Sequence, residues 1–383
     1  MNHSSLPDVL VCGGGVMGMT AAWRLAARGA VVELLELGRT GQGASQAALG
    51  ALWPPAPTGS GQLQQLHRQS LWGYRDFLDE LSAGSGLRAP YLRQGKLELY
   101  TSQRAADQAR LQVQAACRQW PTANAADDAG TPVMEMLPPA AVTALEPQVA
   151  AGAAEGQLCR WSAQVDVDVL LRALREACIR SGVRMSEYSP VSRLESEGST
   201  IRGLISGNNC KKAGKYLLCT GVWTHLLGEP AAAAAIVPVK GQALLLRTKS
   251  PLLHHIVKRD RIFLVPWPDG RILVGSTTEP EAGFDQRNTP DGVNFLRQGA
   301  AGICPALAEA KVENIWAGLR PSGPKHRPIM GQFPSYDNLY ICAGHFKIGI
   351  GFAPMAAGLM TDLILTGQCT PDIREFAPAG STN

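Results

Sequence analysis

Hydrophobic and polar positions alternate in blocks along the chain, and the blocks predict short buried strands followed by helices. The apolar run Val9–Cys12 ends at three consecutive glycines, and an alanine-rich helical spacing follows over residues 17–28. Residues 31–35 form a second apolar run, which ends at Glu36. Strand, glycine turn, helix and strand in this order predict a βαβ unit at the start of the chain.

The rest of the chain contains both helix-like and strand-like spacing of apolar residues. Apolar positions three and four residues apart predict helices at 63–81, 104–118, 138–144, 167–181, 293–302 and 353–365, the last with Pro354 in its first turn. Alternating or continuous apolar runs predict strands at 91–100, 183–188, 191–195, 201–206, 215–219, 237–247, 261–265, 271–276, 312–319 and 339–343. The small polar residues of 124–130 predict a loop.

These blocks predict an α/β protein of two discontinuous domains, since 383 residues exceed what one compact core usually holds. We expect a doubly wound, Rossmann-like domain from residues 1–88, 152–235 and 314–383. We expect a second domain, an antiparallel sheet with helices (α+β), from residues 89–151 and 236–313.

Composition narrows the class of protein. A hydrophobic content of 45% with 18% charged residues is typical of a folded globular chain. The net charge of +4 is small, and no basic run with interleaved aromatic residues points to nucleic acid. Nine scattered cysteines without Cys-x-x-Cys spacing argue against a zinc site or a disulfide framework, and favour a reducing compartment.

Two further segments bear on localisation. The first strand begins almost at once, with no basic, apolar and small-residue signal before it, so we expect a cytoplasmic protein. The apolar stretch 348–365 is interrupted by Gly351, Pro354, Gly358 and Asp362, which favours a buried helix over a membrane span.

The first glycine turn carries the clearest chemistry. Gly13 permits a tight turn, Gly15 lets the backbone approach a pyrophosphate, and Gly18 lets the following helix pack close to the sheet. The N–H groups at a helix start attract negative charge, and Glu36 stands where an acid binds a ribose hydroxyl. We therefore predict dinucleotide binding.

Three later segments suit the same ligand. Residues 38–51 are mostly glycine and alanine, so their backbone is able to lie against a large flat molecule. The strand at 215–219 ends at Thr220 and Gly221, which places a second strand edge near the dinucleotide. Residues 344–351 form a second glycine-rich turn before the last helix.

Several motifs in order along nearly the whole chain resemble the FAD-dependent glycine oxidase and D-amino-acid oxidase family, nearest to the thiamine-pathway type. The motifs are the 13–18 glycine fingerprint with Glu36, Thr-Gly-Val-Trp at 220–223, Pro-Val-Lys-Gly-Gln at 238–242, Trp-Ala-Gly-Leu-Arg-Pro at 316–321, and Gly-His-Phe at 344–346 before Gly351.

The resemblance implies FAD as cofactor, with the first domain binding it and the second binding substrate. Motifs and resemblance together assign to the cofactor Gly13, Gly15, Val16, Met17, Gly18, Glu36, Ala44, Ser45, Leu49, Gly50, Ala51, Val191, Thr220, Gly221, Gly344, His345, Phe346, Ile348, Gly349, Ile350 and Gly351. Relatives that bind flavin covalently use a cysteine just after the Trp-Ala-Gly motif. Residues 320–325 contain none, so we expect non-covalent FAD.

The resemblance also implies the reaction: hydride passes from an amine carbon beside a carboxylate to flavin N5, the imine hydrolyses, and oxygen becomes hydrogen peroxide. The family's matching arginine, Arg320 here, binds the substrate carboxylate through two hydrogen bonds, which a guanidinium suits. Two positions depart from the glycine oxidase pattern. Phe263 replaces a tyrosine that helps bind the carboxylate, and Lys347 replaces a frequent arginine, so the amine itself is left open.

Other interpretations remain at this point. The enzyme is either an oxidase or a dehydrogenase that passes electrons to a quinone or a partner protein. The glycine fingerprint and Glu36 by themselves also allow an NAD-dependent dehydrogenase or a simple binding module. The sequence does not place Trp53, Tyr91, Trp267 or His326 in the pocket or outside it, and a homo-oligomer is possible.

Overall fold

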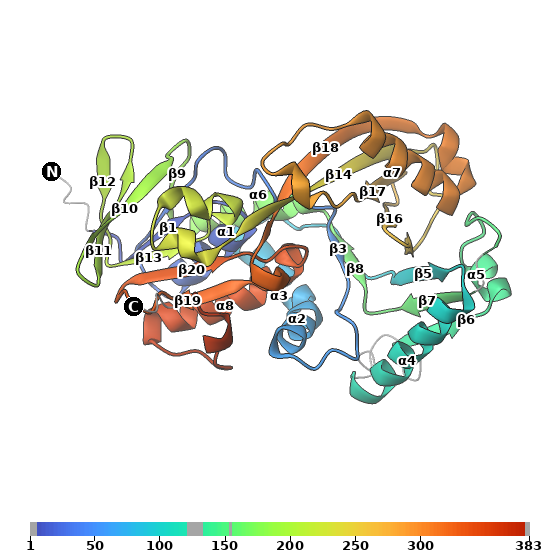
Figure 1. Cartoon of the computed structure of the whole chain (residues 1–383), viewed down its shortest axis with the longest axis horizontal. Helices are drawn as coiled ribbons and strands as arrows, with labels where there is room; N and C mark the ends of the chain where they lie inside the picture. Colours follow the sequence, from blue (N-terminus) through green and yellow to red (C-terminus); the bar gives the residue numbers. More distant parts are fainter. Residues whose placement is uncertain (1–5, 121–132, 153–154, 380–383) are drawn as a thin grey trace.

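Two large β-sheets lie side by side in the computed structural model, which describes residues 6–120, 133–152 and 155–379. In Figure 1 the six-stranded sheet is at the left, and the eight-stranded sheet is at the right. The loop expected at 124–130 falls outside the described residues. The helices are α1 (Val16–Ala27), α2 (Gln62–Trp72), α3 (Tyr74–Ser85), α4 (Gln103–Gln119), α5 (Pro139–Leu145), α6 (Val167–Arg180), α7 (Pro290–Ile303) and α8 (Gly349–Thr366).

The six-stranded sheet has the order β19-β20-β13-β1-β2-β9. Its strands are β1 (Val9–Cys12), β2 (Val32–Leu35), β9 (Arg184–Ser186), β13 (Lys215–Leu218), β19 (Ile329–Gln332) and β20 (Leu339–Ala343). All neighbours are parallel except β19 and β20. The βαβ unit predicted at the start of the chain is confirmed as β1, α1 and β2.

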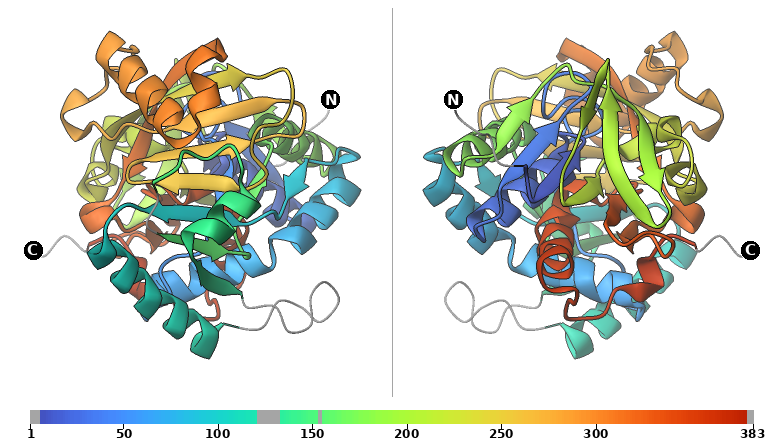
Figure 2. Two further views of the ribbon diagram at one scale, coloured as in Figure 1. Left: turned by 90° about the vertical axis from the view of Figure 1, so that its right-hand side faces the viewer. Right: turned by 90° about the vertical axis from the view of Figure 1, so that its left-hand side faces the viewer.

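Alternate side chains of β1 enter two different cores. Val9 and Val11 pack among α1, α6 and α8, whereas Leu10 and Cys12 face the opposite side. That side is covered by a three-stranded sheet of β10 (Val191–Glu197), β11 (Thr200–Ser206) and β12 (Asn209–Lys211), seen in front in the right panel of Figure 2. The parallel sheet is therefore covered by helices on one face and by strands on the other, and both faces are buried.

The larger sheet has the order β18-β14-β17-β16-β15-β5-β7-β6, antiparallel except between β15 and β5. Its strands are β5 (Lys96–Tyr100), β6 (Met134–Leu137), β7 (Glu155–Cys159), β14 (Val237–Arg247), β15 (Ile256–Arg259), β16 (Ile262–Pro266), β17 (Arg271–Gly275) and β18 (Lys311–Ser322). Leu296, Ala300 and Ile303 of α7 pack against one face of this sheet in a continuous core. Because β7 and β18 pair into this sheet, we propose that both belong to the substrate-binding domain.

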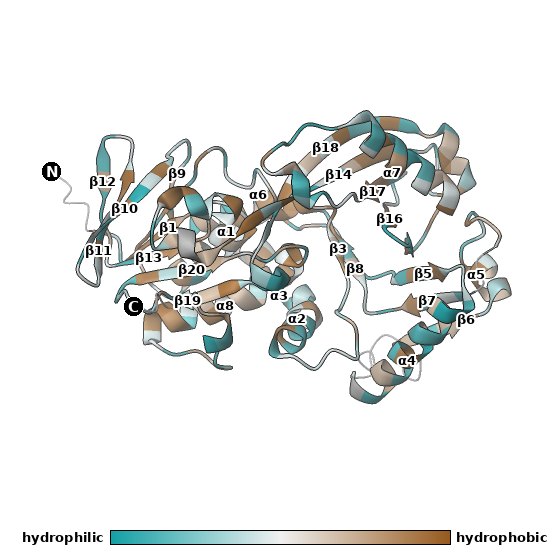
Figure 3. Ribbon diagram, in the orientation of Figure 1, coloured by the Kyte–Doolittle hydropathy of each residue, from teal (hydrophilic) through white to brown (hydrophobic). Residues whose placement is uncertain are grey.

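A small sheet of β3 (Ala51–Leu52), β8 (Ala163–Val165) and β4 (Tyr91–Leu92) lies between the two large ones in Figure 1. Figure 3 shows hydrophobic residues concentrated along the buried strands and α8, with hydrophilic residues spread over the outer helices such as α4. The chain is thus folded around several apolar cores, one of which includes Leu52, Ala163 and Val165 of the small sheet.

Two helix predictions are wrong in their bounds. The helix expected at 63–81 is two helices, because the chain turns at Gly73, which ends α2 and precedes α3. The last helix begins at Gly349 rather than residue 353, so Pro354 lies inside it. Proline has no N–H to donate to the carbonyl four residues earlier. The Tyr74 hydroxyl donates to that carbonyl, of Ile350, at 3.1 Å, and so replaces the missing bond.

By length and composition α8 is apolar enough to cross a membrane, and it is the one described helix with this property. However, 56% of it is buried, and it packs against α1 and α2 within the main core. This packing is the arrangement of a core helix, as the interrupted apolar stretch predicted.

Candidate functional site

A cavity of about 1060 Å³ lies between the six-stranded and eight-stranded sheets. One wall is built by the segments that follow β1, β13 and β20 and by the loop at 38–51. The other wall is the face of the larger sheet that carries Phe263 and Arg320. The cavity is at the large end of the range for small-molecule sites, so it has room for an extended ligand.

The structure brings together almost every residue that the sequence singled out. Those lining the cavity are Gly13, Gly15, Val16, Met17, Glu36, Ala44, Ser45, Leu49, Gly50, Ala51, Val191, Thr220, Gly221, Phe263, Arg320, Gly344, His345, Phe346, Lys347, Ile348, Gly349, Ile350 and Gly351. Gly18 is outside this set. Of the four aromatic residues left open, Trp53 lines the cavity, whereas Tyr91, Trp267 and His326 do not.

Gly13 and Gly18 allow the backbone segments around β1 to approach closely. Gly13 has a φ of +108°, and a Cβ there would lie 2.4 Å from the Cys219 carbonyl oxygen. A Cβ on Gly18 would lie 1.8 Å from the Gly13 carbonyl oxygen. Gly18 therefore serves the close packing of α1 on the turn and does not touch the ligand space.

The N-terminal end of α1 faces the cavity with neighbours suited to a nucleotide. Glu36 accepts hydrogen bonds from the N–H groups of Gly14 at 2.5 Å and Gly38 at 2.9 Å, which fixes its carboxylate at the cavity wall. The Val16 N–H donates to the Ser45 hydroxyl at 3.0 Å. This bond draws the small-residue loop toward the helix start, where the helix dipole favours a phosphate.

Arg320 is held in the opposite wall by three acceptors. Its Nη1 donates to the carbonyls of Lys240 and Thr277, both at 3.2 Å, and Nη2 donates to the Ser276 hydroxyl at 2.9 Å. A guanidinium has five N–H donors. Among the described residues, Nε and one Nη2 hydrogen have no partner, and these two nitrogens form one edge of the guanidinium. That edge is able to bind a carboxylate through two parallel bonds.

A glycine makes room for this guanidinium. A Cβ on Gly241 would lie 2.1 Å from Nη2 of Arg320, so a larger residue in the neighbouring strand would displace the arginine. Burial lowers the pKa of Arg320, and the negative charge of Glu279 acts in the opposite direction. An arginine remains charged despite this shift.

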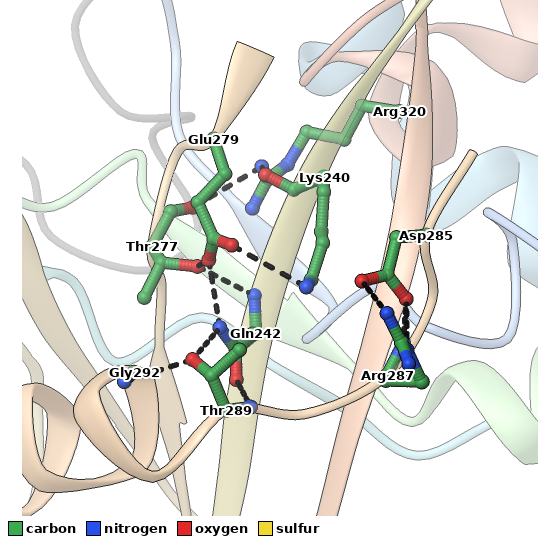
Figure 4. Close-up of polar contacts among 9 residues, drawn as sticks. All are labelled: Lys240, Gln242, Thr277, Glu279, Asp285, Arg287, Thr289, Gly292 and Arg320. Atoms are coloured by element: carbon green, nitrogen blue, oxygen red, sulfur yellow. Dashed lines mark hydrogen bonds and ion pairs between the residues drawn. The ribbon is translucent and has the colours of Figure 1, made fainter. Parts of the chain in front are cut away.

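A buried polar network supports Arg320 from the far side of β14, as Figure 4 shows. Lys240 is almost fully buried, and its Nζ lies 3.4 Å from a Glu279 carboxylate oxygen. Gln242 donates to Glu279 at 2.8 Å and accepts from the N–H of Thr289 at 2.8 Å. The network thus connects the strand that carries the Lys240 carbonyl to the N-terminus of α7.

Phe263 and Trp53 form an apolar part of the cavity wall. Their rings meet edge to face with centroids 5.1 Å apart. Sequence reasoning did not single out His67, Lys258, Arg261 and Ser276, which also line the cavity. They carry no motif; the pairing of β15, β16 and β17 is what brings three of them to the cavity.

The fold and the cavity together define a dinucleotide-dependent enzyme, and comparison with known proteins identifies its class. The family model described as FAD dependent oxidoreductase matches residues 8–363. The chain belongs to this family, so its cofactor is FAD and the NAD interpretation is wrong. FAD fits the residues present: the α1 N-terminus with Ser45 suits the pyrophosphate, and Glu36 suits the ribose.

Two curated relatives and one solved structure illustrate the likeness. Glycine oxidase of Bacillus licheniformis is 28% identical, and the match covers 94% of this chain and 93% of that protein. Bifunctional protein ThiO/ThiG of Synechocystis sp. is 30% identical over 97% of this chain, which spans 53% of that protein's length. The crystal structure of glycine oxidase from Geobacillus kaustophilus has a TM-score of 0.89 and 28% identity, and covers 97% of this chain and 98% of that one.

Proposed function

We propose that this enzyme oxidatively deaminates a small amine-containing acid, with oxygen as the electron acceptor and hydrogen peroxide as product. The observation that carries the proposal is Arg320, which lines the cavity in which FAD fits and keeps two of its donors unused. Relatives named glycine oxidase support the same chemistry.

Bound FAD supplies a two-electron oxidant for the amine-bearing carbon. The chain's own residues bind and orient the substrate. Arg320 holds the carboxylate in one plane, and its anchors at Lys240, Thr277 and Ser276 keep that plane fixed. Phe263 and Trp53 present carbon surface to the substrate's side chain and exclude water from that side. Phe263 donates no hydrogen bond, so binding of this carboxylate rests on Arg320.

Anaerobic mixing of the yellow holoenzyme with an amine panel tests the proposal. We expect glycine, N-methylglycine or DL-alanine to bleach the flavin absorbance, and ethylamine, which lacks a carboxylate, to leave it unchanged. A holoenzyme that no amine-containing acid bleaches would refute the proposal. Readmission of air then separates the two acceptors: rapid return of colour with peroxide indicates an oxidase, whereas reoxidation by a quinone dye and not by oxygen indicates a dehydrogenase.

We also propose a cytoplasmic location. All nine cysteines are free, and those buried beside the cavity, Cys12, Cys219 and Cys342, form no disulfide. Fractionation of cells that produce the natural protein tests this location. The possible homo-oligomer stays a prediction, for which size-exclusion chromatography with light scattering is the measurement.

A further inference from the structure

Besides Arg320, three basic residues line the cavity: Lys258, Arg261 and Lys347. Lys258 on β15 pairs opposite Phe263 on β16, and paired residues of neighbouring strands share a face. Lys347 reaches the same cavity from the turn between β20 and α8. Positive side chains from both walls therefore line one cavity.

These charges are close enough to act on one another. Burial lowers the pKa of Lys347, and the positive charges of Arg320, Lys258 and Arg261 lower it further. Lys347 and Arg261 are exposed to water, which screens this repulsion. An anionic ligand that displaces this water from the cavity would be attracted by both charges.

Internal counter-charges are few. Lys258 has a partner in Glu98, which is shared with Lys96. Lys347 and Arg261 form no ion pair with any carboxylate in the described part of the chain, and Lys347 Nζ lies 5.1 Å from the Phe346 ring centroid. Two acids line the cavity. Glu36 lies at the nucleotide end of the cavity and accepts a hydrogen bond from the Gly14 N–H. The other acid, Asp260, is exposed and lies in the turn between β15 and β16.

One substrate carboxylate occupies the open edge of Arg320 and leaves the charges of Lys347 and Arg261 unmatched. We propose that the preferred substrate carries a second carboxylate, bound by Lys347 and Arg261, so that the enzyme acts on an amino diacid. This substrate class rests on the proposed amine oxidation at the same site. The apolar wall of Phe263 and Trp53 then contacts the carbon chain between the two acid groups.

Inert acids test the binding step without turnover. Succinate and glutarate have two carboxylates, and propionate and butyrate are the matched acids with one. Dissociation constants are measured from the change in flavin absorbance of the oxidised holoenzyme. We expect each diacid to bind about tenfold more tightly than its one-acid match, the effect of one charge-assisted contact. Equal affinities for both pairs would overturn the inference.

Variants assign the preference to the named residues. We expect Lys347→Gln and Arg261→Gln each to lose most of the diacid preference, measured as the ratio of the dissociation constants for a diacid and its one-acid match. Lys249→Gln, an exposed lysine outside the cavity, is the matched control and keeps the full preference. A preference that persists in both cavity variants would overturn the inference.

Turnover separates this inference from a general effect on the amine. We compare flavin reduction by DL-aspartate and DL-alanine across pH, in the holoenzyme and in Lys347→Gln. If the cations merely lower the amine's pKa, both substrates shift alike and their ratio is unchanged, which contradicts the second-acid site. If the diacids bind tightly but no amine bleaches the flavin, the amine oxidation fails while the two-anion site stands.

Discussion

At the scale of single residues, the five hydrogen-bond donors of Arg320 determine its role. Three are used on the protein and two are left for a ligand, so its replacement removes both the anchoring and the two-donor edge. We expect Arg320→Lys to raise KM for a carboxylate-bearing amine roughly a hundredfold, about 3 kcal/mol. Steady-state peroxide formation measures this. Arg374→Lys, at a highly exposed ion pair with Asp372, is the control and leaves KM unchanged.

Glu279 is the ion-pair partner of the nearly fully buried Lys240, so Glu279→Gln removes that pair and leaves Asp285 as the acid that still acts on Lys240. We expect a loss of about 3 kcal/mol of unfolding free energy at pH 7, measured in urea. Asp372→Asn, at an exposed pair, is the control and changes stability by less than about 0.5 kcal/mol. A loss equal to that of the control would show that water reaches Lys240.

The same variant has a defined pH dependence. Burial raises the pKa of Glu279, but hydrogen bonds from Thr277 and Gln242 and the charge of Lys240 outweigh it, and the pKa is lowered overall. A carboxyl with a lowered pKa stabilises the fold above its unfolded value, near 4.5, and loses that contribution as the pH falls through its folded value. The stability gap between wild type and Glu279→Gln should therefore narrow below about pH 4.5.

A residue of the site is predictable from the sequence when it stands in a motif. The glycine turn and Arg320 stand in motifs with fixed spacing, and the structure places both at the cavity. Lys258, Arg261 and Ser276 reach it through the pairing of β15, β16 and β17, which no local pattern encodes. The roles of Phe263 and Lys347 as substrate contacts stay predictions.

At the scale of elements, two helical glycines contrast in what surrounds them. A Cβ on Gly18 in α1 would meet the Gly13 backbone, whereas a Cβ on Gly358 in α8 has nothing within 4 Å. We expect Gly18→Ala to displace α1 and abolish FAD binding, measured as loss of flavin absorbance after gel filtration. Gly358→Ala should keep FAD and stabilise the protein by about 1 kcal/mol, since alanine favours a helix over glycine.

Element bounds were predicted well where apolar spacing and capping residues agree. Asp166 caps α6 through the Val169 N–H, at the expected start, whereas Thr289 caps α7 through the Gly292 N–H and the helix begins three residues before the expected residue 293. The start of α8 was wrong because proline usually marks a first turn. A hydroxyl from Tyr74, distant in sequence, satisfies the Ile350 carbonyl instead, and single-sequence patterns contain no such tertiary bond.

At the scale of the whole molecule, the cavity lies between the two large sheets, and loops from distant parts of the chain line it. Segments near Gly13, Thr220 and Gly344 line one side, and Phe263 and Arg320 line the other. Because these segments are far apart in sequence, FAD binds the folded protein and not the unfolded chain. With FAD at one hundred times its dissociation constant, we expect about 2.7 kcal/mol of added stability and a higher Tm than that of the apoprotein.

The stability that FAD adds should be concentrated in the segments that contact it as well as spread over the whole fold. In the loop at 38–51 the carbonyls of Gly38, Ala47 and Gly50 accept hydrogen bonds from other segments, but the amides of residues 43–46, 49 and 50 donate to no described residue. These amides should therefore exchange readily without ligand. Hydrogen exchange with and without FAD should slow most in this loop and in residues 344–351, and least in α4 and α7, which lie away from the cavity. Equal slowing in α7 and in the loop would contradict a cofactor held by these segments, because a purely global gain protects every element alike.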